Sequence, residues 1–92
     1  MKSPVFLDVS LLASPEPFQR ILEALAEVEK DQYLLVKHRK EPIPLYGVLR
    51  EGSFVFLTHS LGESDYRVAI WHEGEPETEK AVLLKFKNEG WT

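Results

Sequence analysis

The sequence contains no cysteine. This absence excludes disulfide bonds, thiolate metal ligands and any persulfide or thioester carried by the chain's own sulfur. Long apolar runs are also missing, since none approaches the roughly 18 residues that a membrane-spanning helix needs. The opening stretch MKSPVFLDVS has one lysine and no small-residue cleavage site, so we expect no signal peptide. These features predict a cytoplasmic protein that does not bind a membrane.

Positive charge is in deficit, because 11 lysine and arginine residues face 15 aspartate and glutamate residues and leave a net charge of -4. A nucleic-acid binder needs a surplus of cations on one face, so nucleic acid is not an expected partner. One local exception is the segment KHRK, in which Lys37, Arg39 and Lys40 surround His38. With the start of the following helix, this segment could accept a phosphate or an acidic partner segment.

The composition that remains is that of an ordinary globular domain, with 92 residues, 43% hydrophobic and 28% charged. A chain of this length can bury one core, and we expect one compact domain. We assign residues 1–75 to this domain. Residues 76–92 form a C-terminal extension that packs on the same domain or on a partner.

The first two predicted elements are a strand over residues 5–9 and a helix that begins at Pro15. Ser14 suits the N-cap, Pro15 suits the first helical position, and Glu16 lies in the positive first turn. Apolar residues then recur at steps of three and four and form one apolar face: Phe18, Ile21, Leu22, Leu25 and Val28.

Further strands are predicted over residues 33–38, 53–60 and 66–72, the last two as a hairpin. Pro42 and Pro44 favour a short helix over residues 44–50. The resulting order, βαβαββ, predicts an α/β (α+β) two-layer sandwich with a mixed four-stranded sheet and two helices on one face.

Apolar residues occur on both faces of the predicted hairpin, so a second layer must cover the other face. The C-terminal extension is the candidate. Acidic residues at its start, lysines near its end and Gly90 beyond favour a helix. A strand that presents Val82, Leu84 and Phe86 on one side is the alternative.

The stretch LDVSLLASPEPFQRILEAL resembles the opening of the TusA/SirA-like sulfur-carrier family. In that family a strand ending in Leu-Asp leads through a short loop to Cys-Pro-x-Pro at the start of a helix. Leu7 and Asp8 match the strand end, and Pro15 and Pro17 match both prolines. Ser14 stands where the family's cysteine would be.

The segment EPIPLYGVL is similar to a Pro-x-Pro-Leu-Tyr signature of an uncharacterised TusA-like branch, a domain of unknown function. Pro42, Pro44, Leu45 and Tyr46 match this signature. The branch carries Asp-His ahead of the motif, where this chain has Arg39 and Lys40, so no role of that histidine is carried over. The resemblance spans roughly residues 5–72 and implies the strand and helix order predicted above.

In the sulfur carriers, a helix N-terminus favours the thiolate of the cysteine. A serine hydroxyl holds no persulfide, and a serine nucleophile needs a general base, which no histidine near Ser14 in sequence supplies. We therefore predict no catalytic residue and no enzyme. What remains is an inherited site of Ser14, Pro15, Glu16 and Pro17, in which Ser14 caps the helix.

The three histidines, His38, His59 and His72, lie at or near strand ends, but their spacing matches no compact ligand motif. We expect no metal site and no cofactor. Tyr46 anchors the second helix to the sheet or stacks on a ligand.

The leading functional prediction is a non-catalytic adaptor or accessory subunit that acts through contacts with a protein partner. A homodimer through an apolar sheet face or the C-terminal segment is compatible with it. The alternative is a small-ligand or cofactor-binding domain, in which the loop around Ser14 and one basic segment form neighbouring walls. That segment, KHRKEPIPLY, contributes Lys37, His38, Arg39, Lys40, Pro42, Pro44 and Tyr46. Weak RNA binding is a further alternative.

Overall fold

The computed structural model describes residues 2–91. The first residue of the predicted domain 1–75 and the last residue of the predicted extension 76–92 therefore lie outside the described residues. Along the chain the secondary structure alternates and then ends in a hairpin followed by a helix. The elements are β1 (Val5–Asp8), α1 (Glu16–Leu25), β2 (Leu34–His38), α2 (Ile43–Glu51), β3 (Phe54–Gly62), β4 (Asp65–His72) and α3 (Pro76–Glu89).

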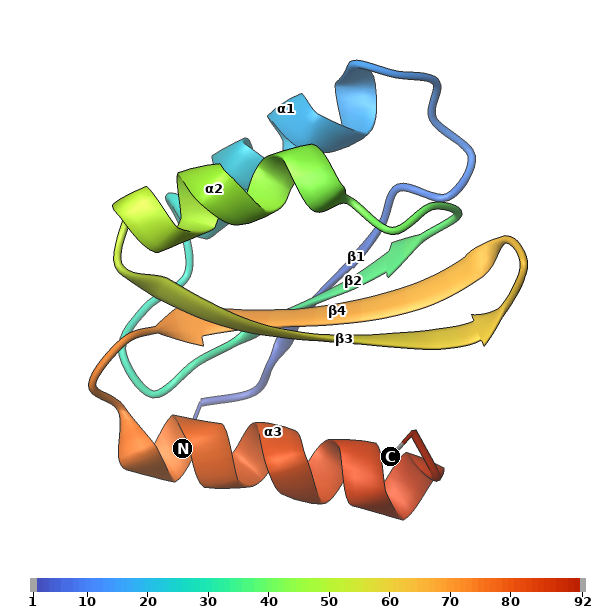
Figure 1. Ribbon diagram of the computed structural model, residues 1–92. Coiled ribbons are helices and arrows are strands. Elements are labelled where there is room, and N and C mark those ends of the chain that lie inside the picture. Colours follow the sequence, from blue (N-terminus) through green and yellow to red (C-terminus); the bar gives the residue numbers. More distant parts are fainter. Residues whose placement is uncertain (1, 92) are drawn as a thin grey trace.

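The four strands form one mixed sheet in the order β1-β2-β4-β3. β1 runs parallel to β2, while β4 pairs antiparallel with both β2 and β3. Figure 1 shows α1 and α2 on one face of this sheet and α3 on the other. The predicted fold class is confirmed, and α3 adds a third layer.

The main core lies between the sheet and the helices α1 and α2. Alternate residues of each strand face this layer, because successive side chains of a strand point to opposite faces. The strands contribute Leu34, Val36, Val68 and Ile70, and the helices contribute Ile21, Leu25, Leu45 and Leu49.

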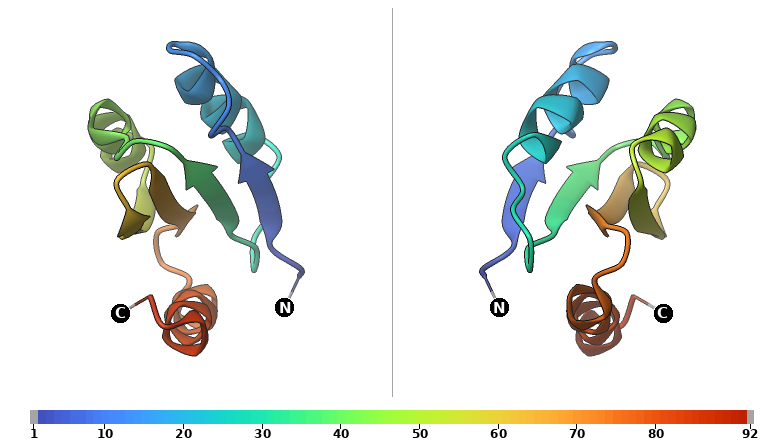
Figure 2. Two further views of the ribbon diagram at one scale, coloured as in Figure 1. Left: turned by 90° about the vertical axis from the view of Figure 1, so that its right-hand side faces the viewer. Right: turned by 90° about the vertical axis from the view of Figure 1, so that its left-hand side faces the viewer.

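The second core lies beneath α3, which Figure 2 shows from both ends of the sheet. Leu35, Ala69 and Trp71 pack there against Val82 and Phe86 of the helix. The C-terminal segment is therefore a helix that packs on the sheet of its own chain, and the alternative of a strand is wrong.

The ends of α3 follow the predicted signals. Pro76 occupies the first turn, where its missing N–H costs nothing. Gly90 ends the helix with φ of 74°, in the left-handed region that glycine enters without strain.

The start of α1 corrects one prediction. The helix begins at Glu16 with Pro15 at the N-cap, and no side chain caps it, so the predicted N-cap role of Ser14 is wrong. The Glu16 amide already donates to the Ala13 carbonyl at 3.0 Å, and Pro15 and Pro17 have no N–H. The amides nearest to Ser14 therefore leave its hydroxyl nothing to accept.

Within the described chain, no helix combines the length and the apolar character required to cross a membrane.

Candidate functional site

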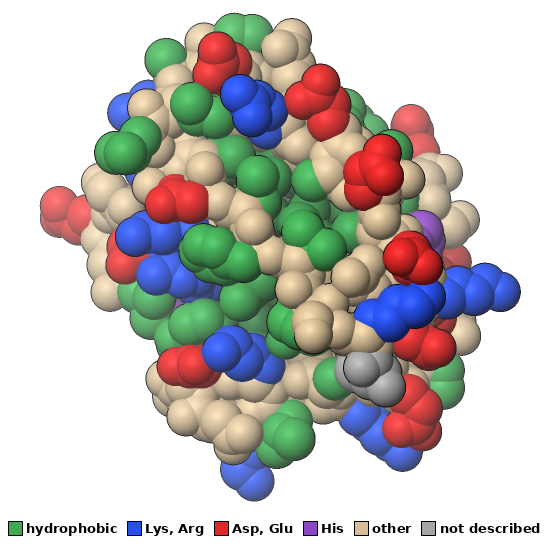
Figure 3. Space-filling view, turned by 180° about the vertical axis from the view of Figure 1, so that it is seen from behind, with side chains coloured by type: hydrophobic (Ala, Val, Ile, Leu, Met, Phe, Trp, Pro, Cys, Tyr) green, Lys and Arg blue, Asp and Glu red, His purple; other side chains and the backbone are tan. Residues whose placement is uncertain are grey.

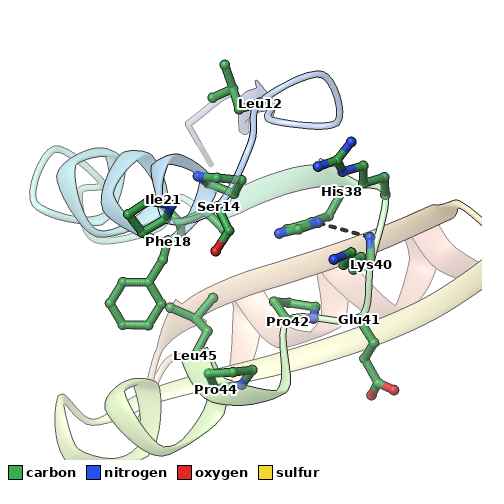
Figure 4. A pocket seen from close by; sticks show the side chains of 13 residues that line it. Leu12, Ser14, Phe18, Ile21, His38, Lys40, Glu41, Pro42, Pro44 and Leu45 are labelled. Atoms are coloured by element: carbon green, nitrogen blue, oxygen red, sulfur yellow. Dashed lines mark hydrogen bonds between the residues drawn. The ribbon is translucent and has the colours of Figure 1, made fainter.

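A cavity of about 390 Å³ lies where the loop before α1 meets the loop between β2 and α2 (Figure 4). The structure thus brings together the two segments that the sequence singled out, SPEP and KHRKEPIP. The lining residues are Leu12, Ser14, Pro15, Pro17, Phe18, Ile21, His38, Arg39, Lys40, Glu41, Pro42, Pro44 and Leu45.

Most of the cavity wall is apolar. The four prolines of the two Pro-x-Pro segments line it, and the side chains of Phe18, Ile21 and Leu45 continue the apolar wall into the main core. Prolines suit this place because each helix starts here, and proline is tolerated in a first turn, where its N–H would have no helical partner. One sequence pattern therefore both starts the helices and builds the wall.

The start of α2 offers the cavity no backbone donor. The Ile43 amide donates to the Glu41 carbonyl at 2.9 Å, and the Leu45 amide donates to the Pro42 carbonyl at 3.0 Å. Pro42 and Pro44 have no N–H. All four positions at which a helix N-terminus exposes free N–H groups are thus accounted for. The expectation that this helix start aids phosphate binding is wrong.

His38 ends β2 and is 8% exposed. The Lys40 backbone N–H donates to its Nδ1 at 3.1 Å, so the neutral ring carries its proton on Nε2. Figure 4 shows the other side of the ring directed into the cavity, toward Ser14. Burial first, and then the charges of Arg39 and Lys40, hold the pKa of His38 below its usual value. At neutral pH, His38 is an uncharged hydrogen-bond donor to the cavity.

Positive charge gathers around the cavity, because Arg39 and Lys40 both line it and both are exposed. Among residues 2–91, the ion pairs are formed by other side chains, and no carboxylate lies within pairing distance of these two. Glu41 also lines the cavity, but its carboxylate accepts a hydrogen bond from the Tyr46 hydroxyl at 3.1 Å. Figure 4 shows the Glu41 side chain turned away from the cavity. The polar side of the cavity is therefore cationic.

Tyr46 holds the cavity wall in place from behind. Its ring stacks on Phe56 of β3 with 4.2 Å between ring centroids, and its hydroxyl lies 2.7 Å from the Thr58 hydroxyl. Burial raises the pKa of Tyr46, so the phenol stays protonated. These contacts confirm the prediction that Tyr46 anchors α2 to the sheet. Tyr46 is not among the residues that line the cavity.

Two other residues of the predicted sites lie elsewhere. Lys37 belongs to the alternate set of β2 residues and pairs with Arg67, so it shares a sheet face with Leu35 and not with His38. Glu16 is exposed in the first turn of α1, outside the cavity lining.

The histidines do not converge. His38 pairs with Tyr66 near the start of β4, whereas His72 ends that strand and contacts the Val28 carbonyl at 3.3 Å. His59 lies on the outer strand β3, where it pairs with Arg67 of β4. In the part of the chain that the structure describes, no three side chains of metal-ligating type gather.

The sequence analysis missed that His38 faces Ser14. The signal was present in the alternation of β2, because His38 shares its face with Leu34 and Val36 of the main core. The helices of that core carry both Pro-x-Pro segments, so a histidine on this face at the end of β2 is directed toward them.

Comparison with known protein families now gives this site a context. Residues 6–72 match the model of an uncharacterised conserved protein family, DUF2249. The chain belongs to the DUF2249 family. The matched range begins in β1 and ends with β4, so it includes every residue that lines the cavity and leaves α3 outside. Neither the curated proteins nor the solved structures give a match.

Proposed function

We propose that this DUF2249 domain binds a small organic ligand in the cavity between the starts of α1 and α2. The cavity itself carries the proposal. Its 390 Å³ falls within the range of about 300–1,000 Å³ that is typical of ligand sites, and apolar walls surround a few converging polar groups. Ser14, His38, Arg39 and Lys40 are those groups, and each comes from one of the two Pro-x-Pro segments or the strand end beside them.

We further propose that the domain is TusA-like and does not transfer sulfur. The two Pro-x-Pro segments support the relationship, and the serine at the position of the family's cysteine argues against the chemistry. Serine catalysis is not favoured either, because the Nε2 proton of His38 leaves no basic nitrogen toward Ser14. Incubation with a persulfide donor should leave the intact mass unchanged. A sulfur adduct on the washed protein would overturn this proposal.

Ligand binding is tested first on the freshly purified protein. Native mass spectrometry should show a retained small molecule, or a thermal-shift panel of metabolites should contain compounds that raise the melting temperature. The blocking variant Ser14→Phe fills the cavity from its rim and should abolish either signal. Ser60→Phe, on the exposed end of β3, is the matched control and should keep it. A native mass equal to that of the chain alone, together with no change in melting temperature across the panel, would contradict the proposal.

An adaptor role is a second proposal, and its basis has shifted from the hairpin to the outer strand β1. The apolar residues that motivated it, Ala69 and Trp71, pack beneath α3. Phe6 on β1 is 60% exposed, and hydrophobic side chains gather on the face seen from behind, where β1 lies (Figure 3). A specific partner should co-purify with the wild-type chain and be lost with Phe6→Ser. Equal recovery of proteins with both chains would count against this role.

A further inference from the structure

We infer that the ligand of this cavity is a small carboxylic acid, bound as its anion with its apolar body between the prolines. This inference rests on the proposed function and specifies the class of ligand. The carboxylate is recognised by Arg39 and Lys40, and the Nε2–H of His38 and the Ser14 hydroxyl complete its hydrogen bonding.

The first argument is the absence of an internal partner for the two cations. The chain has more acidic than basic residues, with 15 against 11, yet no described carboxylate pairs with Arg39 or Lys40. Glu41 is the nearest along the chain, and Tyr46 holds it away from the cavity. Both cations are therefore available to attract an anion from outside the described chain.

The second argument separates a carboxylate from a phosphate. Phosphate sites in proteins draw on several free backbone N–H groups at a helix N-terminus or a nest. Here α2 presents none, because prolines remove two and backbone carbonyls occupy the other two. At the start of α2, side chains are therefore the donors that remain, and a planar carboxylate needs only a few donors of the guanidinium and ammonium type.

The third argument concerns the rest of the ligand. Prolines 15, 17, 42 and 44, together with Phe18 and Leu45, form walls that contribute no polar side chain. A highly polar acid would lose its hydration there without replacement hydrogen bonds. An aliphatic or aromatic body, in contrast, gains by leaving water. The volume, near the lower end of the usual range, suits a compact acid.

The experiment compares acids with their own amides, which have nearly the same shape and no charge. The probes are benzoate and benzamide, octanoate and octanamide, and 2-naphthoate and 2-naphthamide, with inorganic phosphate as a further arm. Binding is measured by calorimetry and by chemical shifts of the Lys40 amide and the His38 ring. At least one acid should bind about tenfold or more tightly than its amide, and phosphate should bind more weakly than that acid.

Variants assign the binding to this cavity. Arg39→Gln and Lys40→Gln should each weaken the binding of the acid about fivefold or more and leave the binding of the corresponding neutral amide unchanged. Lys37→Gln removes the same charge two residues from Arg39 and three from Lys40, on the opposite face of the sheet, and it should change the binding of neither compound. All three substitutions fall on side chains that are at least partly exposed to solvent, so we expect the variants to fold. Folding is checked by the NMR signals of backbone N–H groups away from the cavity, which should not change.

An independent readout uses the absence of cysteine. Ser14→Cys introduces a single thiol at the cavity, and a saturating amount of the preferred acid should slow its alkylation several-fold. If no acid binds better than its amide, or if phosphate alone binds, the inference is overturned. Binding of neutral compounds would in that case leave the proposed function standing, whereas a fully negative metabolite panel would remove both.

Discussion

Ser14 and His38 face one another across the cavity, an arrangement that in hydrolases pairs a nucleophile with its base. Here the backbone of Lys40 decides otherwise, because its N–H occupies Nδ1 and leaves the proton of the neutral ring on Nε2. Two donors, one from each side, then face whatever enters. At this scale the position of one backbone amide distinguishes a binding site from a catalytic one.

The lowered pKa of His38 predicts a pH dependence of stability. Between the folded pKa and about 6.5, the unfolded chain binds more protons at this residue than the folded chain does. The free energy of unfolding should therefore fall as the pH drops below about 6.5. His38→Asn keeps an acceptor for the Lys40 amide and should flatten this slope in urea unfolding series at several pH values.

His59→Asn is the control for that series, since His59 lies on β3 outside the cavity lining, and its slope should match the wild type. A slope that survives in His38→Asn would show that other groups cause it.

Ser14→Ala should change stability by less than about 0.5 kcal/mol, the range of ordinary surface substitutions. The reason is that the Ser14 side chain caps nothing in α1. Loss of a true N-cap would cost about 1 kcal/mol. Urea unfolding distinguishes the two values, and a loss of the larger size would mean that Ser14 holds the helix start in solution after all.

Among the elements, the helices differ in how far their sequences determine them. The three-and-four spacing of α1 was clear enough to predict its buried residues Ile21 and Leu25, and Gly90 marked the end of α3. The first turn of α1 was less predictable, because Ser14 and Pro15 suit an N-cap and a first position, yet Pro17 is also tolerated in the first turn of a helix that begins one residue later. Only the hydrogen bond from Glu16 to Ala13 decides between them.

Substitution by alanine should change the stability in opposite directions at two glycines, one inside a helix and one at a helix end. Gly47 lies inside α2, and a Cβ there meets nothing within 4 Å, so Gly47→Ala should stabilise by about 0.5–1 kcal/mol. Gly90 has φ of 74°, so Gly90→Ala should destabilise by about 1 kcal/mol. Thermal melts of the two variants test both changes. Shifts of the melting temperature in the same direction would contradict the assigned place of Gly47 inside α2 or of Gly90 at the end of α3.

The packing of α3 predicts a large effect from one side chain. Phe86 is 1% exposed, and Phe86→Ala should lower the free energy of unfolding by about 3–5 kcal/mol. Leu84 on the same helix is 57% exposed, so Leu84→Ala should change it by less than about 0.5 kcal/mol. Similar losses from both in urea titrations would mean that α3 is not docked as described.

For the whole molecule, the order of strands and helices and the mixed sheet follow from the sequence, because alternation, helical spacing and proline each leave a local mark. The cavity leaves no such mark. It depends on β2 bringing His38 beneath the starts of two helices that are 27 residues apart, Glu16 and Ile43. Such a meeting is a property of the topology. The sequence analysis proposed the two walls, with His38 in one of them, but not that its ring is directed toward Ser14.

Net charge acts at this scale too and bears on the RNA alternative. A chain with a charge of -4 should show no measurable retention on single-stranded RNA at about 0.15 M salt, where screening reduces what the local cations add. Filter binding over a salt series tests this. Retention that falls steeply with salt would revive the RNA alternative.

The two tryptophans place the intrinsic fluorescence of the molecule on one face of the sheet. Trp71 lies beneath α3, and Trp91 packs edge-on against Phe86 with 5.1 Å between ring centroids, so both report on the same helix. No tryptophan lines the cavity on the opposite side of the sheet. Intrinsic fluorescence will therefore follow the docking of α3. Because no tryptophan touches the cavity, a fluorescence change when the cavity fills would show that occupancy on one face of the sheet is transmitted to the other.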